Sequence, residues 1–94
     1  MDCDNSLARK LDSADALETR GFAHLLLEKM PAAIADFDCA VALNPKLAPA
    51  FFGRAVAKER LGDEAGAARD YAAARAIDAN IEAELTRQNV LPPS

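Results

Sequence analysis

Tryptophan is absent from the 94-residue sequence and tyrosine occurs once, so large aromatic side chains contribute little to its core. The strongest β-forming residues are few and scattered, and no alternation of polar and apolar residues persists, which argues against β-strands. Alanine is the commonest apolar residue, and such small side chains suit contacts between closely packed helices. The composition therefore predicts an all-α fold.

Basic runs and long apolar stretches are also missing. The chain has 11 basic and 15 acidic residues, a net charge of -4, and no cluster that could neutralise a phosphate backbone. No stretch approaches the roughly 18 consecutive apolar residues of a membrane span, and residues 1–12 lack the apolar core of a signal peptide. We therefore expect a cytoplasmic protein that contacts neither nucleic acid nor membrane.

Residues that commonly bind metals or form disulfides are equally few. Cys3 and Cys39 are the two cysteines, and no histidine lies near either in the sequence, so we expect two free thiols and no metal site. His24 is the single histidine of the chain, and we interpret it as a packing residue. We therefore expect no cofactor.

Catalytic motifs are not recognisable. The glycines at positions 21, 53, 62 and 66 form neither a dinucleotide-binding fingerprint nor a phosphate-binding loop. No serine or cysteine is arranged with His24 as a nucleophile and its base. Asp36 and Asp70 recur with the period of an internal repeat and are interpreted as surface groups of two equivalent hairpins, not as a general acid and base. We therefore expect no catalytic residues and no enzyme activity.

The internal repeat has a period of 34 in the sequence. Shifting the chain by 34 aligns identical or similar residue types at twelve places without a gap. The first copy of these twelve consists of Ala16, Leu17, Arg20, Gly21, Ala23, Leu27, Ala33, Asp36, Phe37, Ala40, Leu43 and Asn44. Duplication is the simplest explanation, and repeats of this length are typical of stacked helical units.

Each copy is predicted to form two helices. Apolar residues at helical spacing predict helices over residues 14–28 and 31–43 in the first copy, and over 48–61 and 64–77 in the second. Pro31 suits the first turn of a helix, and Gly62 and Asp63 are expected to act as a left-handed C-cap and an N-cap. The connections are so short that the paired helices must be antiparallel and in contact.

The repeated positions indicate how the hairpins pack. Small residues at Gly21 and Ala33, and at the matching positions of the second copy, let two helix backbones approach closely. Phe37 and its copy Tyr71 are expected to fill the space between one hairpin and the next.

These residues resemble the tetratricopeptide repeat (TPR) family, whose unit is a helix–turn–helix of the same period. The first motif is L-x-x-R-G-x-A followed by A-I-x-D-F-x-x-A-x-x-L-N-P, within residues 17–45. The second is F-x-x-R-A-x-A, then L-G-D, then A-A-x-D-Y-x-x-A-x-x-I-D-A, within residues 51–79. The sequence departs from the family pattern at His24 and Lys58, where an aromatic residue is usual, at Glu28, which replaces a glycine, and at Ala79, which replaces a proline.

The resemblance implies a single TPR domain over residues 1–94, an α-solenoid of two antiparallel hairpins. Its parts would be an N-terminal segment (1–13), repeat 1 (14–47), repeat 2 (48–81), and a capping helix with a tail (82–94). Ile81, Leu85 and Val90 form the apolar side of that last helix, and a solenoid needs such a cap to cover its final hairpin. Residues 6–11 have the pattern of a further short helix.

In this family the first helices of successive repeats line a concave groove that binds partners. Glu18, Phe22 and Leu25 have the spacing of one helical stripe, away from the Leu17 and Gly21 face, and Leu26 borders it. Together with their copies in the second repeat, they make up the expected partner-binding groove: Glu18, Phe22, Leu25, Phe52, Val56 and Glu59. Two exposed phenylalanines there would form an apolar patch beside two carboxylates.

The predicted function is a non-catalytic protein–protein interaction scaffold that binds an apolar peptide or helix, either neutral or basic, in this groove. Three occupants could instead cover the stripe: the N-terminal segment, a neighbouring repeat or a second subunit. If the helices are rotated relative to this assignment, the same side chains belong to the core. The alternative function is a structural or oligomerisation module, either a homodimer or the C-terminal end of a longer TPR array.

Overall fold

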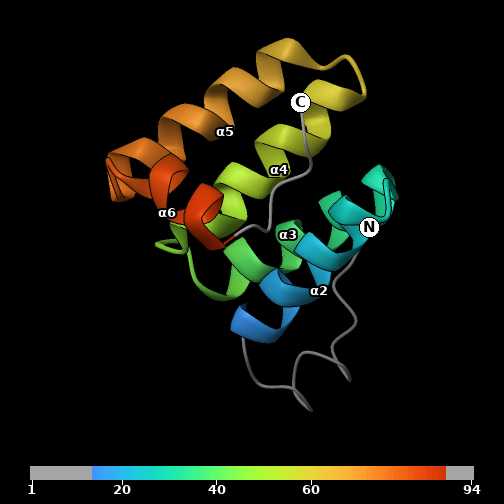
Figure 1. Cartoon of the computed structure of the whole chain (residues 1–94), viewed down its shortest axis with the longest axis horizontal. Helices are drawn as coiled ribbons and strands as arrows, with labels where there is room; N and C mark the ends of the chain where they lie inside the picture. Colours follow the sequence, from blue (N-terminus) through green and yellow to red (C-terminus); the bar gives the residue numbers. More distant parts are fainter. Residues whose placement is uncertain (1–13, 89–94) are drawn as a thin grey trace.

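The computed structural model describes residues 14–88, which form helices joined by short turns and contain no β-strand (Figure 1). The all-α prediction is therefore confirmed for this part of the chain. The predicted helix over residues 6–11, and the part of the capping segment that contains Val90, lie outside the described residues. The described helices are α2 (Ala14–Leu26), α3 (Met30–Leu43), α4 (Ala48–Arg60), α5 (Glu64–Ile77) and α6 (Ile81–Gln88).

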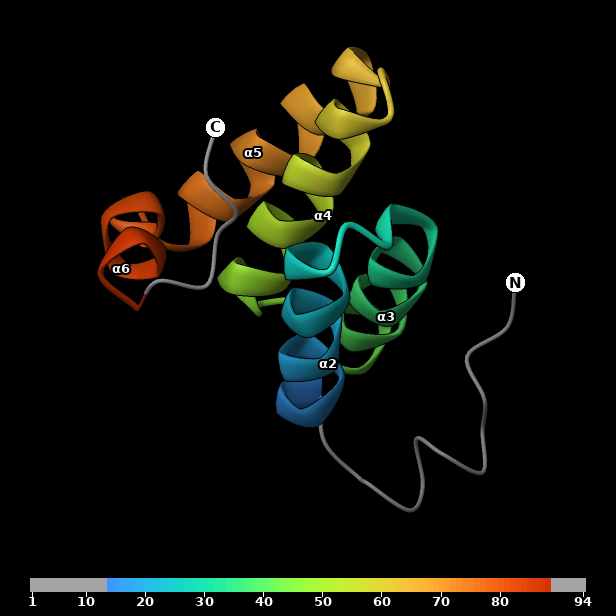
Figure 2. The same ribbon diagram turned by 45° about the vertical axis from the view of Figure 1, so that its right-hand side comes forward.

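The helices pack in consecutive pairs. α2 lies against α3 to form the first hairpin, and α4 lies against α5 to form the second. α3 joins the two hairpins by packing on α4, and α2 also contacts α4. The short α6 lies on α4, on the other side from α3, so that α4 occupies the middle of the molecule (Figure 2).

The ends of the helices recur at the spacing of the sequence repeat. α2 spans residues 14–26 and α4 spans residues 48–60, so both ends are shifted by one repeat period. α3 spans residues 30–43 and α5 spans residues 64–77, with the same shift at both ends. Equivalent helices of the two copies therefore have the same length, as the duplicated sequence pattern predicts.

The turn of the second hairpin has the predicted caps. Gly62 has a φ of 93°, and the Asp63 carboxylate accepts a hydrogen bond of 3.0 Å from the Gly66 backbone N–H. At the equivalent turn of the first hairpin, Glu28 takes the left-handed conformation with a φ of 63°, which is costly for a residue with a side chain. Pro31 lies in the first turn of α3, where its missing N–H leaves no helical hydrogen bond unmade.

Phe37 lies at the centre of the core, between the two hairpins, and is fully buried. A Cβ atom added at Gly21 of α2 would lie 2.7 Å from its ring, and one added at Gly53 of α4 would overlap the same ring. Two glycines therefore let α2 and α4 close on Phe37 from both sides. Phe22 adds an edge-on ring contact with a centroid distance of 5.0 Å. Tyr71, in contrast, is only half-buried and packs edge-on against Phe52 of its own hairpin.

A buried carboxylate joins the two helices of the first hairpin. Asp36 of α3 is 5% exposed, and its Oδ1 accepts hydrogen bonds from Nη2 and Nε of Arg20 at 2.7 and 3.0 Å. Its Oδ2 lies 2.7 Å from Nδ1 of His24, one turn further along α2. The interpretation of Asp36 as a surface group is therefore wrong. A carboxylate can be buried here because both of its oxygens are hydrogen-bonded.

The second hairpin repeats this arrangement. Asp70, also 5% exposed, pairs with Nη2 of Arg54 at 2.9 Å and with Nζ of Lys58 at 3.0 Å, so it is not a surface group either. Burial by itself would raise the pKa of Asp70, but the hydrogen bonds from Arg54 and Lys58 lower it below its usual value. Arg54 also reaches back to Asp38 of α3, with Nη1 and Oδ1 2.7 Å apart, and so links the two hairpins.

Cys39, on α3, is half-buried and disulfide-bonded, so the expectation of two free thiols is wrong. The second sulfur lies outside the described residues. The expectation rested on the small number of cysteines, but a disulfide needs only one pair whose Cα atoms lie within about 7 Å in the folded chain.

Candidate functional site

Three of the six predicted groove residues belong to the core. Leu25 is fully buried, and Phe52 and Phe22 are 3% and 6% exposed, so the expectation of two exposed phenylalanines is wrong. Successive residues of a helix are about 100° apart around its axis, so position 25 lies about 40° from position 21, and position 22 lies about 60° further round. The buried arc of α2 is wide because this helix packs against both α3 and α4.

The other three predicted residues remain partly accessible. Val56 is half-buried against the core, and Glu59 is exposed and accepts a hydrogen bond of 2.7 Å from the Tyr71 hydroxyl. Glu18 is half-buried. The structure therefore does not assemble the six residues into one exposed surface, and of these three Glu18 lines the pocket described next.

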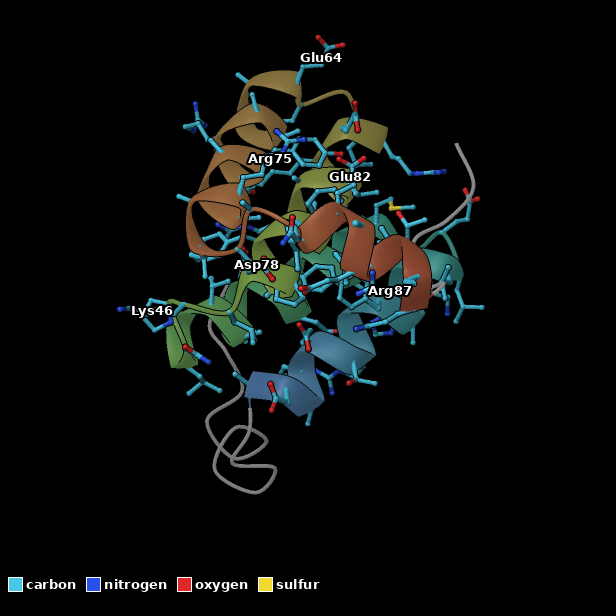
Figure 3. The ribbon with its side chains drawn as sticks, turned by 60° about the vertical axis from the view of Figure 1, so that its left-hand side comes forward. Lys46, Glu64, Arg75, Asp78, Glu82 and Arg87 are labelled. Atoms are coloured by element: carbon cyan, nitrogen blue, oxygen red, sulfur yellow. The ribbon has the colours of Figure 1, made fainter. Side chains whose placement is uncertain are left out.

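The pocket lies between α2, the beginning of α4 and the end of α6, and its volume is about 360 Å³. It is lined by Glu18, Thr19, Phe22, Ala23 and Leu26 of α2, Pro49 of α4, and Leu85 and Gln88 of α6. Most of this lining is apolar, and among these lining residues Glu18 is the one with an ionisable side chain. Figure 3 looks onto α6, which forms one wall of the pocket.

Sequence reasoning placed Glu18 and Phe22 in the site and Leu26 at its border, but it missed the contribution of α6. One signal could have identified that contribution. Leu85 and Gln88 lie one repeat period after Phe51 and Arg54, so the helical register of the repeat continues into α6. A third helix in the same register was therefore available to line the same surface as α2 and α4.

Glu18 has an unusual environment within the pocket. Its Oε2 atom is buried and has no hydrogen-bond partner among residues 14–88. Burial, with a smaller contribution from the nearby negative charge of Asp15, raises the pKa of the Glu18 carboxyl to about 7. At neutral pH this carboxyl is therefore close to half ionised, whereas an ordinary glutamate is fully ionised.

The second hairpin shows what else can occupy the Glu18 position. Phe52, the repeat equivalent of Glu18, is buried and packs edge-on against Tyr71, with ring centroids 4.9 Å apart. A helix position that serves packing in one hairpin carries a carboxyl group in the other. The charge at Glu18 is therefore not required by the architecture that the two hairpins share.

His24 does have an acid beside it, because its Nδ1 lies 2.7 Å from Asp36. The second hairpin has Lys58 and Asp70 at the equivalent positions, which supports a structural role for both pairs. Neither His24 nor Asp36 lines the pocket. Within residues 14–88, no three histidine, cysteine, aspartate or glutamate side chains come together as a metal site, and no helix has the length and apolar character to cross a membrane.

α6 is held to the second hairpin by apolar and ionic contacts. Ile81 and Leu85 are both buried in the core. Arg75 of α5 and Glu82 of α6 lie near each other (Figure 3), with Nη2 and Oε1 3.8 Å apart. The wall that α6 contributes to the pocket is therefore anchored through its first turn and through its buried apolar side chains.

Comparison with known proteins gave no further guide to function. No family model, no curated protein and no solved structure matches the chain. The repeated motifs and the geometry of the pocket are therefore the features that indicate a function.

Proposed function

We propose that the chain is a TPR-type scaffold that binds another protein and catalyses no reaction. Two features of the described residues support the family assignment: the helix ends that recur with the repeat period, and the close approach of glycine-bearing helices around Phe37. On this proposal residues 14–47 and 48–81 are the two repeats, stacked as a short α-solenoid, and residues 82–94 cap them.

The observation that carries the proposed function is the pocket formed by α2, α4 and α6. Thr19, Ala23 and Leu26 follow one another along one face of α2 and line about 10 Å of its length. Pro49 provides apolar surface from α4, and α6 lines the pocket with Gln88 and the largely buried Leu85. A pocket with these walls suits an extended apolar peptide or an amphipathic helix, either of which would bury apolar side chains in it.

The scaffold around the pocket is well suited to present a preformed surface. Arg54 connects α3, α4 and α5 through its pairs with Asp38 and Asp70, and Phe37 is enclosed by α2 and α4. Binding to a preformed surface avoids the entropic cost of ordering it. A peptide could therefore bind without rearrangement of the helices.

The experiment is a selection of peptides from a random library displayed on phage, with the full chain as bait, followed by affinity measurement on Ala23→Trp and Ala72→Trp. Both alanines are exposed and helical, but only Ala23 lines the pocket. We expect Ala23→Trp to weaken binding of the selected peptides about tenfold or more, about 1.4 kcal/mol, because the indole fills the pocket. Ala72→Trp should leave the affinity unchanged.

Equal affinity of both variants for the selected peptides would contradict the assignment of the pocket as the binding site. Circular dichroism of each variant establishes that the helices remain folded. If neither the wild type nor the variants bind any selected peptide at micromolar concentration, the scaffold proposal itself fails.

A structural or oligomerisation module is the second candidate, and exposed leucines at the turns favour it. Leu27 and Leu61, at equivalent positions after α2 and α4, are 65% and 55% exposed. The two turns lie close together, since Nη1 of Arg60 is 3.9 Å from Oε2 of Glu28. A homodimer, or a neighbouring unit of a longer array, could cover this apolar surface.

Light scattering coupled to size exclusion tests this candidate. A dimer at high protein concentration that becomes a monomer in Leu27→Ser/Leu61→Ser, while Ala23→Trp remains dimeric, would support self-association through the turns. A monomeric wild type would exclude the homodimer at that concentration.

A further inference from the structure

We infer that Glu18 recognises a cationic group on an apolar stem, such as a lysine or arginine side chain of the bound partner. This inference rests on the proposed function and specifies the chemistry of the partner. It requires the Glu18 carboxylate to meet the cation inside the pocket while the stem lies along the apolar walls.

The first reason is the unsatisfied Oε2 atom. Oε2 of Glu18 is a buried polar atom without a hydrogen bond, and such atoms are destabilising and rare in folded proteins. The other buried carboxylates described above, Asp36 and Asp70, each accept hydrogen bonds on both oxygens. Glu18 is the exception: it carries an oxygen without a partner, and its side chain lines the pocket.

The second reason is the absence of a structural need for charge at this position. Phe52 occupies the equivalent position of the second hairpin and contributes to the core. An apolar residue at position 18 would relieve the burial of the carboxyl, so a glutamate there lowers stability unless a ligand compensates. A cation supplied by a partner would provide that compensation.

The third reason is the character of the walls. Leu26, which is 46% exposed, and Pro49 offer apolar surface that a hydrocarbon stem would cover, and the stems of lysine and arginine pack in this way while the charged end meets a polar partner. A purely apolar occupant would leave Oε2 unsatisfied, and a carboxylate would be repelled by Glu18. A cation without a stem would leave the apolar walls in water.

The raised pKa of Glu18 adds a pH dependence. A bound cation stabilises the ionised carboxylate, so binding lowers the pKa of Glu18 and releases a proton near neutral pH. The affinity for a cation therefore rises as pH increases through about 7. Asp15 on α2 is the charged neighbour that acts on Glu18, and Pro49, Leu85 and Gln88, which line the pocket from α4 and α6, do not titrate.

In the experiment the full chain is titrated with n-hexylammonium or with hexan-1-ol, and NMR measures the binding of each probe. The two probes have the same six-carbon stem and differ in the charged end, and the ammonium remains charged from pH 5.5 to pH 8. At pH 8 we expect hexylammonium to bind about tenfold or more tightly than the alcohol, with shifts at Ala23, Leu26 and Leu85. The preference should shrink at pH 5.5.

Two variants complete the test. Glu18→Gln keeps the size of the side chain and should reduce the preference for hexylammonium to within about twofold, about 0.4 kcal/mol. Glu64→Gln removes the same charge from an exposed position outside the pocket and should preserve the preference. This control separates contact with Glu18 from a general effect of net charge.

Three outcomes would overturn the inference: equal binding of the two probes, no shift of the pocket residues with either probe, or a preference that survives in Glu18→Gln. The proposed function can fail independently. If hexylammonium binds as described but no selected peptide depends on Ala23, the pocket recognises a cationic molecule that is not a protein partner. If selected peptides depend on Ala23 but not on Glu18, the scaffold stands and the cation recognition fails.

Discussion

In the first hairpin Arg20 and His24 pair with the buried Asp36. In the second hairpin Arg54 and Lys58 pair with the buried Asp70 in the same way. These contacts recur because each joins the two helices of a hairpin, so they are part of the shared architecture. The hairpins differ where one of them faces a different neighbour. Comparing equivalent positions therefore separates residues that build the fold from residues that are free to serve a function.

Three differences stand out in this comparison. Phe37 is enclosed by two hairpins, whereas Tyr71 has no third hairpin beyond it among the described residues and is half-buried. The turn of the second hairpin has its glycine, but the first has Glu28. At the position where the second hairpin packs Phe52, the first presents Glu18 to the pocket.

The largest effect should come from the aromatic pair. Phe37→Ala removes a fully buried ring and is expected to lower the free energy of unfolding by about 3–5 kcal/mol. Tyr71→Ala should cost about half as much, because that ring is already partly in water. Urea unfolding followed by circular dichroism measures both, and Phe37→Leu provides a milder variant if Phe37→Ala does not fold. Equal losses would contradict the difference in enclosure.

Asp70 should have the next largest effect. Asp70→Asn leaves Arg54 and Lys58 without their carboxylate and is expected to cost about 3 kcal/mol at pH 7. The pKa of Asp70 is lowered in the folded protein, so its contribution is present above the unfolded value of 3.8 and disappears as pH falls through the folded pKa. The variant and the wild type should therefore converge in stability in strong acid. A constant difference down to pH 2 would contradict this assignment.

Glu18 should show the opposite pH dependence. Its pKa is raised from 4.5 to about 7, so ionisation opposes folding, and the penalty grows as pH rises from about 4.5 and levels off above 7. Glu18→Gln is therefore expected to raise the free energy of unfolding by about 1 kcal/mol at pH 8, a modest figure because the residue is only half-buried and water screens its charge. Little difference is expected at pH 4. Thermal unfolding at the two pH values measures it, and destabilisation at pH 8 would show that Glu18 has a stabilising contact.

The turns should give the smallest effect. Glu28→Gly relieves a left-handed backbone and is expected to stabilise the chain by about 0.5–1 kcal/mol, while Gly62→Ala should destabilise it by a similar amount. Both positions are exposed, so packing changes little. Chemical denaturation of the two single variants measures these values. A loss of stability in Glu28→Gly would indicate that the contact of Glu28 with Arg60 outweighs the strain.

Sequence reasoning predicted the elements well and the site only in part. The apolar spacing and the caps located the helices because those signals act within one or two turns of chain, as Asp63 and Gly62 illustrate. The exposure of Phe22 and Phe52 was predicted wrongly, since it depends on which neighbours cover each face of α2 and α4. Glu18 was identified, but nothing local indicated that one of its oxygens would lack a partner.

By itself the sequence determined the all-helical class, the periodic spacing of the helix ends, and the positions of the turns, because these follow from periodicity and from local backbone preferences. Only the tertiary structure decided that Asp36 and Asp70 are buried, that Phe37 is enclosed between two glycines, and that α2, α4 and α6 surround a pocket. The physical reason is that burial is a property of contacts between helices far apart in the chain. One sequence position can therefore hold a core phenylalanine in one hairpin and a pocket glutamate in the other.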